Sequence, residues 1–278
     1  MRAAVVGHVE WIEFLRVEHL PAAGEIVHAT EWWAEPAGGG AAAAEQLRRL
    51  TGDAMFVTAL GDDELAKRAD EILSSFGLEV HAAVRRGPTR RGVTQIDQTG
   101  ERTITVVGER LSPRADDPLP WDRLTGVDAL YFSAGDVGAL RAARKARVVV
   151  ATTRVFPTLI EAGVRVDALI GSAADPTERR DPAVLDPPPR LVVWTEGAAG
   201  GTFTVDGKEP RRYEAAPLPG PVVDRYGAGD SFAATLAFGL ASTGDIERAL
   251  QLAARAAASV LTGRGPYTGQ LTSEQLGE

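Results

Sequence analysis

The stretch Val223-Asp224-Arg225-Tyr226-Gly227-Ala228-Gly229-Asp230-Ser231-Phe232 decides how the rest of the chain is interpreted. Two glycines flank an alanine, an aspartate follows at once, and apolar residues then recur at helical spacing in Phe232, Leu236 and Leu240. A small-residue loop that leads into a helix leaves backbone N–H groups without partners, and the helix dipole favours negative charge there. The stretch therefore indicates an anion site with Asp230 at its mouth, although for this stretch alone Asp230 as a helix cap after a tight turn is the commoner interpretation.

The pattern Asp224-x-x-Gly227-Ala228-Gly229-Asp230-Ser231-Phe232 closely resembles the signature of the PfkB (ribokinase-like) family of sugar and nucleoside kinases. The resemblance extends along nearly the whole chain. It implies an α/β fold, a three-layer αβα sandwich with a central, mostly parallel sheet and a small β lid. We expect one such domain over residues 1–278, with lid segments at about 8–36 and 84–110.

Composition limits the partners and the chemistry of the chain. Hydrophobic residues make up 44% and charged residues 24% of the 278 residues, which is ordinary for a globular protein with a sizeable core. A net charge of −8 argues against nucleic acid or an anionic membrane as the main partner. The absence of cysteine excludes disulfides, a thiolate metal site and a cysteine nucleophile. With no apolar run long enough for a membrane span or a signal peptide, we expect a cytoplasmic protein.

Strand-like and helix-like segments alternate along most of the chain, which favours parallel strands covered by helices. Ligands of such sheets gather at the carboxyl ends of the strands. The expected strands are Arg2–Val6, Met55–Leu60, Leu78–Val84, Asp128–Phe132, Arg147–Ala151, Asp167–Ile170 and Leu191–Trp194. The expected helices include Glu64–Phe76, Val137–Ala146, Pro157–Ala162 and one capped by Asp245, and Val93–Asp97 with Thr103–Val107 reads as a hairpin.

The resemblance places substrate contacts in two early segments. A glycine triplet, Gly38-Gly39-Gly40, opens an alanine-rich helix and would let a ligand approach the backbone closely, although a flexible joint is the plainer interpretation. The family's asparagine after this loop is replaced by Ala43, and its aspartate after the first strand by Ile12, with Glu10 and Glu13 as the nearest acids. These departures leave the identity of the sugar open.

One dense basic cluster stands out in an acidic chain: Arg85, Arg86, Arg90 and Arg91. A solvated charged surface is the commoner explanation. Beside a substrate lid, however, the cluster could hold an acidic group of the sugar, such as a phosphate or sulfonate. Arg91 is our candidate for a substrate contact.

The nucleotide side is expected after two later strands. Ser172-Ala173-Ala174-Asp175 stands where the family has Asn-x-x-Glu, so the resemblance implies that Ser172 and Asp175 organise magnesium near the phosphates, with Glu178 as a second candidate acid. Thr195-Glu196-Gly197-Ala198-Ala199-Gly200 matches the family's nucleotide loop except for the glutamate, and Thr195, Gly197 and Gly200 become candidate nucleotide contacts. Turns at both places are the alternative.

Together these motifs predict transfer of the ATP γ-phosphoryl group to a primary hydroxyl of a sugar or sugar derivative. Asp230 would act as the base, and the amides of Gly227, Ala228 and Gly229 would stabilise charge on the transferred group while Gly227 and Gly229 also contact the nucleotide. The resemblance implies ATP and Mg²⁺ as cofactors, with a K⁺ ion possible at the backbone of Asp224 and Tyr226, and a possible homodimer through the lid.

Two alternatives remain open at this stage. One is a kinase of the same fold that acts on a nucleoside or another small metabolite. The other is a non-catalytic sugar or nucleotide sensor, which the intact Gly-Ala-Gly-Asp loop disfavours. A Rossmann dinucleotide enzyme is disfavoured too, because Gly7 is followed by His8-Val9-Glu10 and no Gly-x-Gly-x-x-Gly follows the first strand.

Overall fold

Nine strands form the central sheet in the computed structural model, which describes residues 1–278. Their order across the sheet is β13-β12-β11-β10-β9-β8-β1-β4-β5, and every neighbouring pair from β11 to β5 is parallel, whereas β12 and β13 are antiparallel additions. The bounds are β1 Ala3–Val6, β4 Ala54–Leu60, β5 Glu79–Val84, β8 Ala129–Phe132, β9 Val148–Thr152, β10 Ala168–Ser172, β11 Leu191–Thr195, β12 Gly201–Val205 and β13 Arg211–Tyr213.

Helices cover both faces of this sheet, because its strands carry apolar side chains on both faces. In β1, Val5 points into one core while Ala4 and Val6 point into another, as the alternation of a strand requires. The first core is closed by α1 (Gly39–Thr51), α2 (Glu64–Ser75), α5 (Ala228–Thr243), α6 (Ile246–Val260) and α7 (Ser273–Leu276). The second is closed by α3 (Val137–Ala143) and α4 (Phe156–Ala162). The result is a three-layer sandwich.

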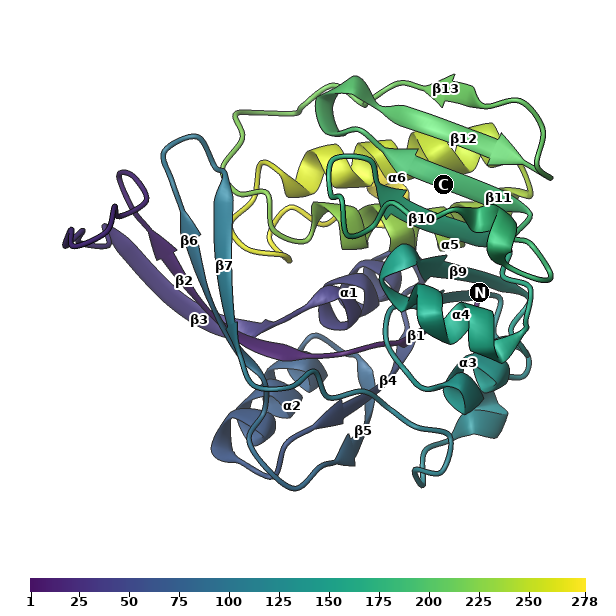
Figure 1. Ribbon diagram of the computed structural model, residues 1–278, viewed down its shortest axis with the longest axis horizontal. Coiled ribbons are helices and arrows are strands. Elements are labelled where there is room, and N and C mark those ends of the chain that lie inside the picture. Colours follow the sequence, from purple (N-terminus) through teal and green to yellow (C-terminus); the bar gives the residue numbers. More distant parts are fainter.

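Four further strands form a separate small sheet that projects from one side of the sandwich (Figure 1). They are β2 (Glu10–Arg16), β3 (Glu31–Ala37), β6 (Arg91–Ile96) and β7 (Arg102–Val107), in the order β3-β2-β6-β7. We call this sheet the lid. One of its faces buries Ile12, Phe14 and Ile96 around Tyr226, which precedes α5. The lid is therefore packed against the loop that leads into α5.

The predicted fold class is confirmed, and most predicted elements lie within a few residues of their observed bounds. Asp245 caps α6 through bonds to the amides of Glu247 and Arg248, as the sequence indicated. β3 lies at the end of the predicted lid segment 8–36 but was not predicted as a strand of its own: it contains Pro36, a residue that strands tolerate at a sheet edge, and β3 is an edge strand. None of the helices combines the length and the apolar character that a membrane crossing would need.

Leu236 tests the packing of α5 against the sheet. It has no exposed surface, and Leu236→Ala should lower the unfolding temperature by about 5 °C or more, because truncating a buried leucine usually costs roughly 2–5 kcal/mol. Leu218 is the matched control: it is 48% exposed, and Leu218→Ala should leave the unfolding temperature almost unchanged. Equal effects in a thermal unfolding experiment would contradict this account of the core.

Candidate active site

Asp230 lies in the first turn of α5, whose amino end is left open to a ligand. Gly227 precedes the helix in the left-handed conformation at φ +80°, which glycine adopts without strain, and no side chain caps the helix. The backbone N–H groups of Ala228, Gly229 and Asp230 make no hydrogen bond within the protein. A side chain added at Gly229 would meet no atom within 4 Å, so open space lies in front of these donors. The arrangement is suited to hold an anion.

The surroundings of Asp230 make its carboxyl a weaker acid than an ordinary aspartate. The side chain is half-buried, and the protein around it raises its pKa to about 6 by desolvation. The positive charges of Arg154 and Arg102 oppose this rise, whereas the negative charges of Glu178 and Glu10 add to it. A carboxylate with a pKa near 6 is mostly ionised at neutral pH and is still basic enough to receive a proton.

The glycine triplet reaches Asp230. A Cβ on Gly39 would lie 2.6 Å from Oδ1 of Asp230, and one on Gly40 would lie 2.6 Å from the backbone nitrogen of His8. Gly38 adopts φ +89° and donates its N–H to the Tyr226 hydroxyl at 3.1 Å. The absence of side chains at these positions is what lets the start of α1 approach the start of α5.

The other predicted substrate contacts do not come together in one site. Glu10 and Ile12 lie on the same face of β2, but Ile12 is completely buried in the lid core. Ala43 is likewise completely buried, within α1. Arg91 belongs to the opposite face of the lid, where it pairs with Glu13 at 3.2 Å. Neither Ile12 nor Ala43 presents a side-chain surface to a ligand, and Arg91 points away from the face that carries Glu10.

Of the basic cluster, Arg90 alone is found beside Glu10. Its guanidinium lies 3.2 Å from the Glu10 carboxylate, which is also 3.6 Å from Nε2 of His8. Arg85 instead makes a paired contact with Asp117 at 2.6 Å, where it holds the segment that follows the lid. The cluster is thus divided among three different surroundings.

The predicted nucleotide residues lie together at the carboxyl ends of two adjacent strands. Ser172 ends β10, Thr195 ends β11, and the two residues are paired in the sheet register. The turn that follows, Gly197–Ala199, leads to Gly200, where a Cβ would lie 2.2 Å from the backbone oxygen of Tyr213. Gly200 therefore has a packing reason of its own, while Gly197 meets nothing within 4 Å and is open to a ligand.

The two acids after β10 have different environments. Asp175 accepts bonds from the backbone and hydroxyl of Thr177 in a local turn. Glu178 is 6% exposed, accepts the N–H of Ser172 at 2.9 Å and binds Arg154 at 2.7 Å. Its charge also raises the pKa of Asp230. Of the two candidates, Glu178 is thus the acid that acts on Asp230 electrostatically.

Asp224 fastens the loop before α5. Its buried carboxylate accepts the N–H of Tyr226 at 2.8 Å and that of Gly265 at 3.0 Å, while burial raises its pKa. The backbone oxygens of Asp224 and Tyr226 accept no hydrogen bond. Tyr226 in turn packs edge-on against Phe14 of the lid, with ring centroids 5.1 Å apart. This loop joins the lid, α5 and the turn after α6.

Sequence reasoning missed three side chains near Asp230. Arg154 comes directly after β9, in the short helical turn Thr153–Val155, and His8 comes directly after Gly7 and β1. Both follow the carboxyl ends of parallel strands, so the general rule for ligand sites in such sheets could have identified them. Arg110 lies three residues beyond β7, and no sequence signal marked it.

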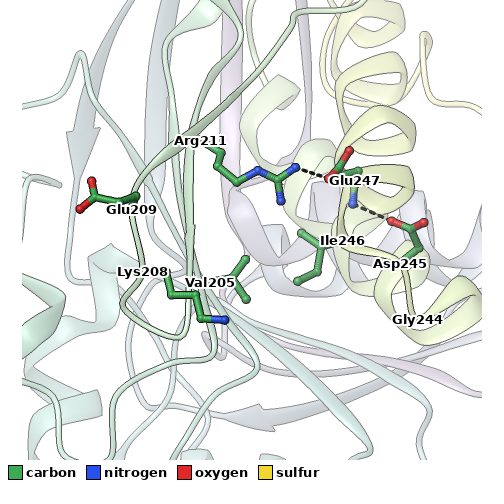
Figure 2. Close-up of a pocket in the computed structure, with 8 residues that line it drawn as sticks. All are labelled: Val205, Lys208, Glu209, Arg211, Gly244, Asp245, Ile246 and Glu247. Carbon is green, nitrogen blue, oxygen red and sulfur yellow. Dashed lines mark hydrogen bonds and ion pairs between the residues drawn. The ribbon is translucent and has the colours of Figure 1, made fainter.

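A separate hollow, shown in Figure 2, lies away from these residues. It is lined by β12, the β12–β13 turn and the α5–α6 junction, and Arg211 pairs there with Glu247. Val205 of β12 is paired with Leu191, the first residue of β11, so this hollow lies at the opposite end of the strands from Asp230. It is not part of the candidate site.

Comparisons with known proteins identify relatives of the whole chain. A family model described as pfkB family carbohydrate kinase matches residues 2–158 and 155–273. A ribokinase of Arabidopsis thaliana is 26% identical over 289 residues, which cover 94% of this chain and 76% of the relative. An ATP-dependent ribose-1-phosphate kinase of Halopiger xanaduensis is 29% identical over 273 residues, which cover 91% of this chain and 89% of the relative. The structure of the Arabidopsis ribokinase with ribose and ATP shares the fold, with a TM-score of 0.74 at 21% identity and coverage of 99% and 96%.

The raised pKa of Asp230 has a consequence for stability. Because folding raises this pKa above its unfolded value, ionised Asp230 opposes folding at neutral pH, and Asp230→Asn should leave the unfolding temperature unchanged or raise it. Asp63 gives the opposite control. Burial alone would raise the pKa of its carboxyl, but hydrogen bonds from Thr89 and from the Ala66 amide outweigh burial and lower it. Asp63→Asn should therefore lower the unfolding temperature at pH 7. A clear loss of stability in Asp230→Asn would show that the carboxylate has structural partners instead.

Proposed function

Because the chain belongs to the pfkB family of carbohydrate kinases, we propose that it transfers the γ-phosphoryl group of ATP to a primary hydroxyl of a sugar or sugar derivative. One observation carries the proposal: Asp230 stands at the open start of α5 with Gly39 directly against it. In this proposal the alcohol lies beside the carboxylate, and the phosphoryl group occupies the open space in front of the free amides at Gly229. The relatives named for ribokinase and ribose-1-phosphate kinase activity support a sugar as acceptor.

The chemistry then follows from the positions of these groups. Asp230 accepts the proton of the acceptor hydroxyl as its oxygen forms a bond to the γ-phosphorus. The bond between that phosphorus and the bridging oxygen of ADP breaks, and ADP leaves with the electron pair. The free amides at the start of α5 stabilise the charge on the transferred group. Arg154, whose charge acts on Asp230, adds a positive charge at the same place.

We assign the nucleotide to the ends of β10 and β11, next to the same helix terminus. Ser172, Thr195 and the open backbone at Gly197 are the groups that would contact it. Glu196, the residue that departs from the family pattern, accepts a hydrogen bond from the Arg212 guanidinium at 2.9 Å. Use of ATP suggests that the protein works in the cytoplasm, as the sequence led us to expect.

Two ions belong to this proposal. Mg²⁺ bound with ATP needs only one or two protein carboxylates, because phosphates and water complete its coordination. Glu178 and Asp175 lie on the nucleotide side and fit that requirement, even though no group of three or more acidic or histidine side chains is present. K⁺ would fit the unbonded backbone oxygens of Asp224 and Tyr226. These ions would neutralise phosphate charge near the site.

A homodimer through the lid is the last part of the proposal. The lid exposes large apolar side chains, with Trp32 63% and Val107 60% exposed, on its two edge strands β3 and β7. Edge strands with such side chains are prone to pair with another chain. Light scattering should give a mass twice that of one chain, and a monomer at all concentrations would remove this part of the proposal.

Replacement of the base is the direct test of the mechanism. Asp230→Asn keeps the size of the side chain but removes its basicity, so kcat should fall by roughly 10²–10⁴-fold. The Kd for a non-hydrolysable ATP analogue should change little, which calorimetry can measure. Asp206→Asn, in the β12–β13 turn, serves as a matched control and should keep full activity. Unchanged turnover in Asp230→Asn would remove the base assignment.

The pH dependence of the wild-type enzyme gives a second test. If the reaction needs ionised Asp230, kcat/KM should fall as the pH drops through about 6 and should level off above that value. The profile should be measured by ADP release with a coupling system that is verified at each pH. A plateau that continues well below pH 5 would mean that the carboxyl is a much stronger acid than its surroundings indicate.

A further inference from the structure

We propose that the sugar acceptor carries a phosphate monoester, and that Arg90, Arg110 and His8 bind this group beside Asp230. This inference rests on the proposed kinase function and adds the chemical class of its substrate. It depends on three side chains at the junction of the lid and β1, which the reaction described above leaves without a task.

The first observation is a set of donors without partners. Arg110 is exposed to solvent and makes no hydrogen bond and no ion pair within the protein. Nε of Arg90 and Nδ1 of His8 are buried and have no hydrogen-bond partner. His8 is 7% exposed. Buried polar atoms are nearly always hydrogen-bonded, so the two buried atoms of Arg90 and His8 indicate a ligand that supplies their partners. The exposed guanidinium of Arg110 is unpaired and lies near them.

The second observation is that these groups share one place. Arg90 lies 3.2 Å from Glu10, and Glu10 lies 3.6 Å from His8. Arg110 is brought near by the lid register: Arg91 is paired with Val107, and a Cβ on Gly108 would lie 3.8 Å from the Cα of Arg90. The ring of His8 lies 3.1 Å from the Cβ position of Gly38, next to the glycine that contacts Asp230. The donors thus surround the acceptor side of Asp230.

The electrostatics agree with this placement. Partial burial and the charge of Arg90 lower the pKa of Arg110, and Arg154 lowers it further. Burial and the charges of Arg110 and Arg90 hold the pKa of His8 well below its usual value. Two guanidinium groups that repel each other lie beside a desolvated imidazole, and Glu10 is the one carboxylate that is paired with either of them. A phosphate, with three acceptor oxygens, would satisfy all three side chains.

The topology separates this group from the nucleotide. The sheet order β11-β10-β9-β8-β1 runs from the nucleotide residues Thr195 and Ser172 to His8 after β1, with Arg154 between them after β9. Arg154 is already paired with Glu178 on the nucleotide side. Arg90 and Arg110 come from the lid instead. A neutral sugar brings no charge to these groups, whereas a phosphate would pair with both guanidinium groups.

The test compares ribose with ribose 1-phosphate, which have the same free primary hydroxyl and differ in one phosphate. Wild-type kcat/KM, measured by ADP release, should be higher for ribose 1-phosphate by about 10- to 100-fold, the usual effect of charged hydrogen bonds. Arg110→Gln should abolish that preference and leave the KM for ATP within about twofold. Ribose 5-phosphate, whose primary hydroxyl is blocked, should inhibit competitively, and gluconate tests whether a carboxylate can replace the phosphate.

Arg86→Gln is the matched control, because Arg86 belongs to the same basic segment, is exposed and makes no ion pair. It should preserve the preference for the phosphorylated sugar. A better rate with ribose than with ribose 1-phosphate would overturn the inference. So would an Arg110→Gln enzyme whose KM for ATP rises equally with every acceptor, since Arg110 would then serve the nucleotide. A preference for gluconate would mean that the site binds a carboxylate instead of a phosphate, and this result would also overturn the inference.

A binding measurement separates this inference from the proposed function. Ribose 1-phosphate is titrated calorimetrically into the wild-type, Asp230→Asn and Arg110→Gln proteins. Binding to the first two, with at least a tenfold weaker Kd in Arg110→Gln, would support the anion site even if no acceptor consumed ATP, in which case the kinase proposal alone fails. Equal binding to all three proteins, or binding to none, would reject the site.

Discussion

The candidate site depends on the close approach of Gly39 to the carboxylate of Asp230. A Cβ at Gly39 would lie 2.6 Å from Oδ1, so the start of α1 and the start of α5 meet at a distance that only glycine permits. This approach desolvates Asp230 from one side, while α5 and the end of β9 enclose it from others. The raised pKa of the carboxyl and the open amides beside it are two consequences of the same packing. The proposed base and the proposed anion site are therefore adjacent because two helices begin at one place.

The lid is connected to this place through hydrogen bonds and aromatic contacts. Tyr226 accepts the N–H of Gly38 and packs against Phe14, which stacks on Trp33 with ring centroids 4.9 Å apart. Asp224 ties the same loop to the turn that holds Gly265. Any movement of the lid would change contacts in the loop that leads into α5. Binding of a ligand under the lid and the geometry of the helix start are thus physically coupled.

Much of the fold could be predicted because its signals are local. Alternating strands and helices, the glycine before α5 and the cap at Asp245 depend on neighbours in the sequence. The site could be predicted only where a local pattern marked it, as at Asp230 and the glycine triplet. Glu178 could be named as a candidate, but its contacts with Ser172 and Arg154 arise from the tertiary fold. Ile12 was a candidate substrate contact by its position in the sequence, and no pattern in the sequence indicated that the tertiary fold would bury its side chain.

The distribution of charge in the molecule follows from what the site has to hold. The chain carries a net charge of −8, and an anionic ligand would be repelled by such a protein at long range. Around Asp230, however, the lid contributes Arg102 and the end of β9 contributes Arg154, and their positive charges act directly on the carboxylate. Charges close to a desolvated carboxylate act on it more strongly than the distant acidic surface does, because salt screens the exposed surface far more strongly than a partly buried site. A local positive potential inside an acidic protein is thus consistent with ligands that carry phosphate on both sides of the reacting hydroxyl.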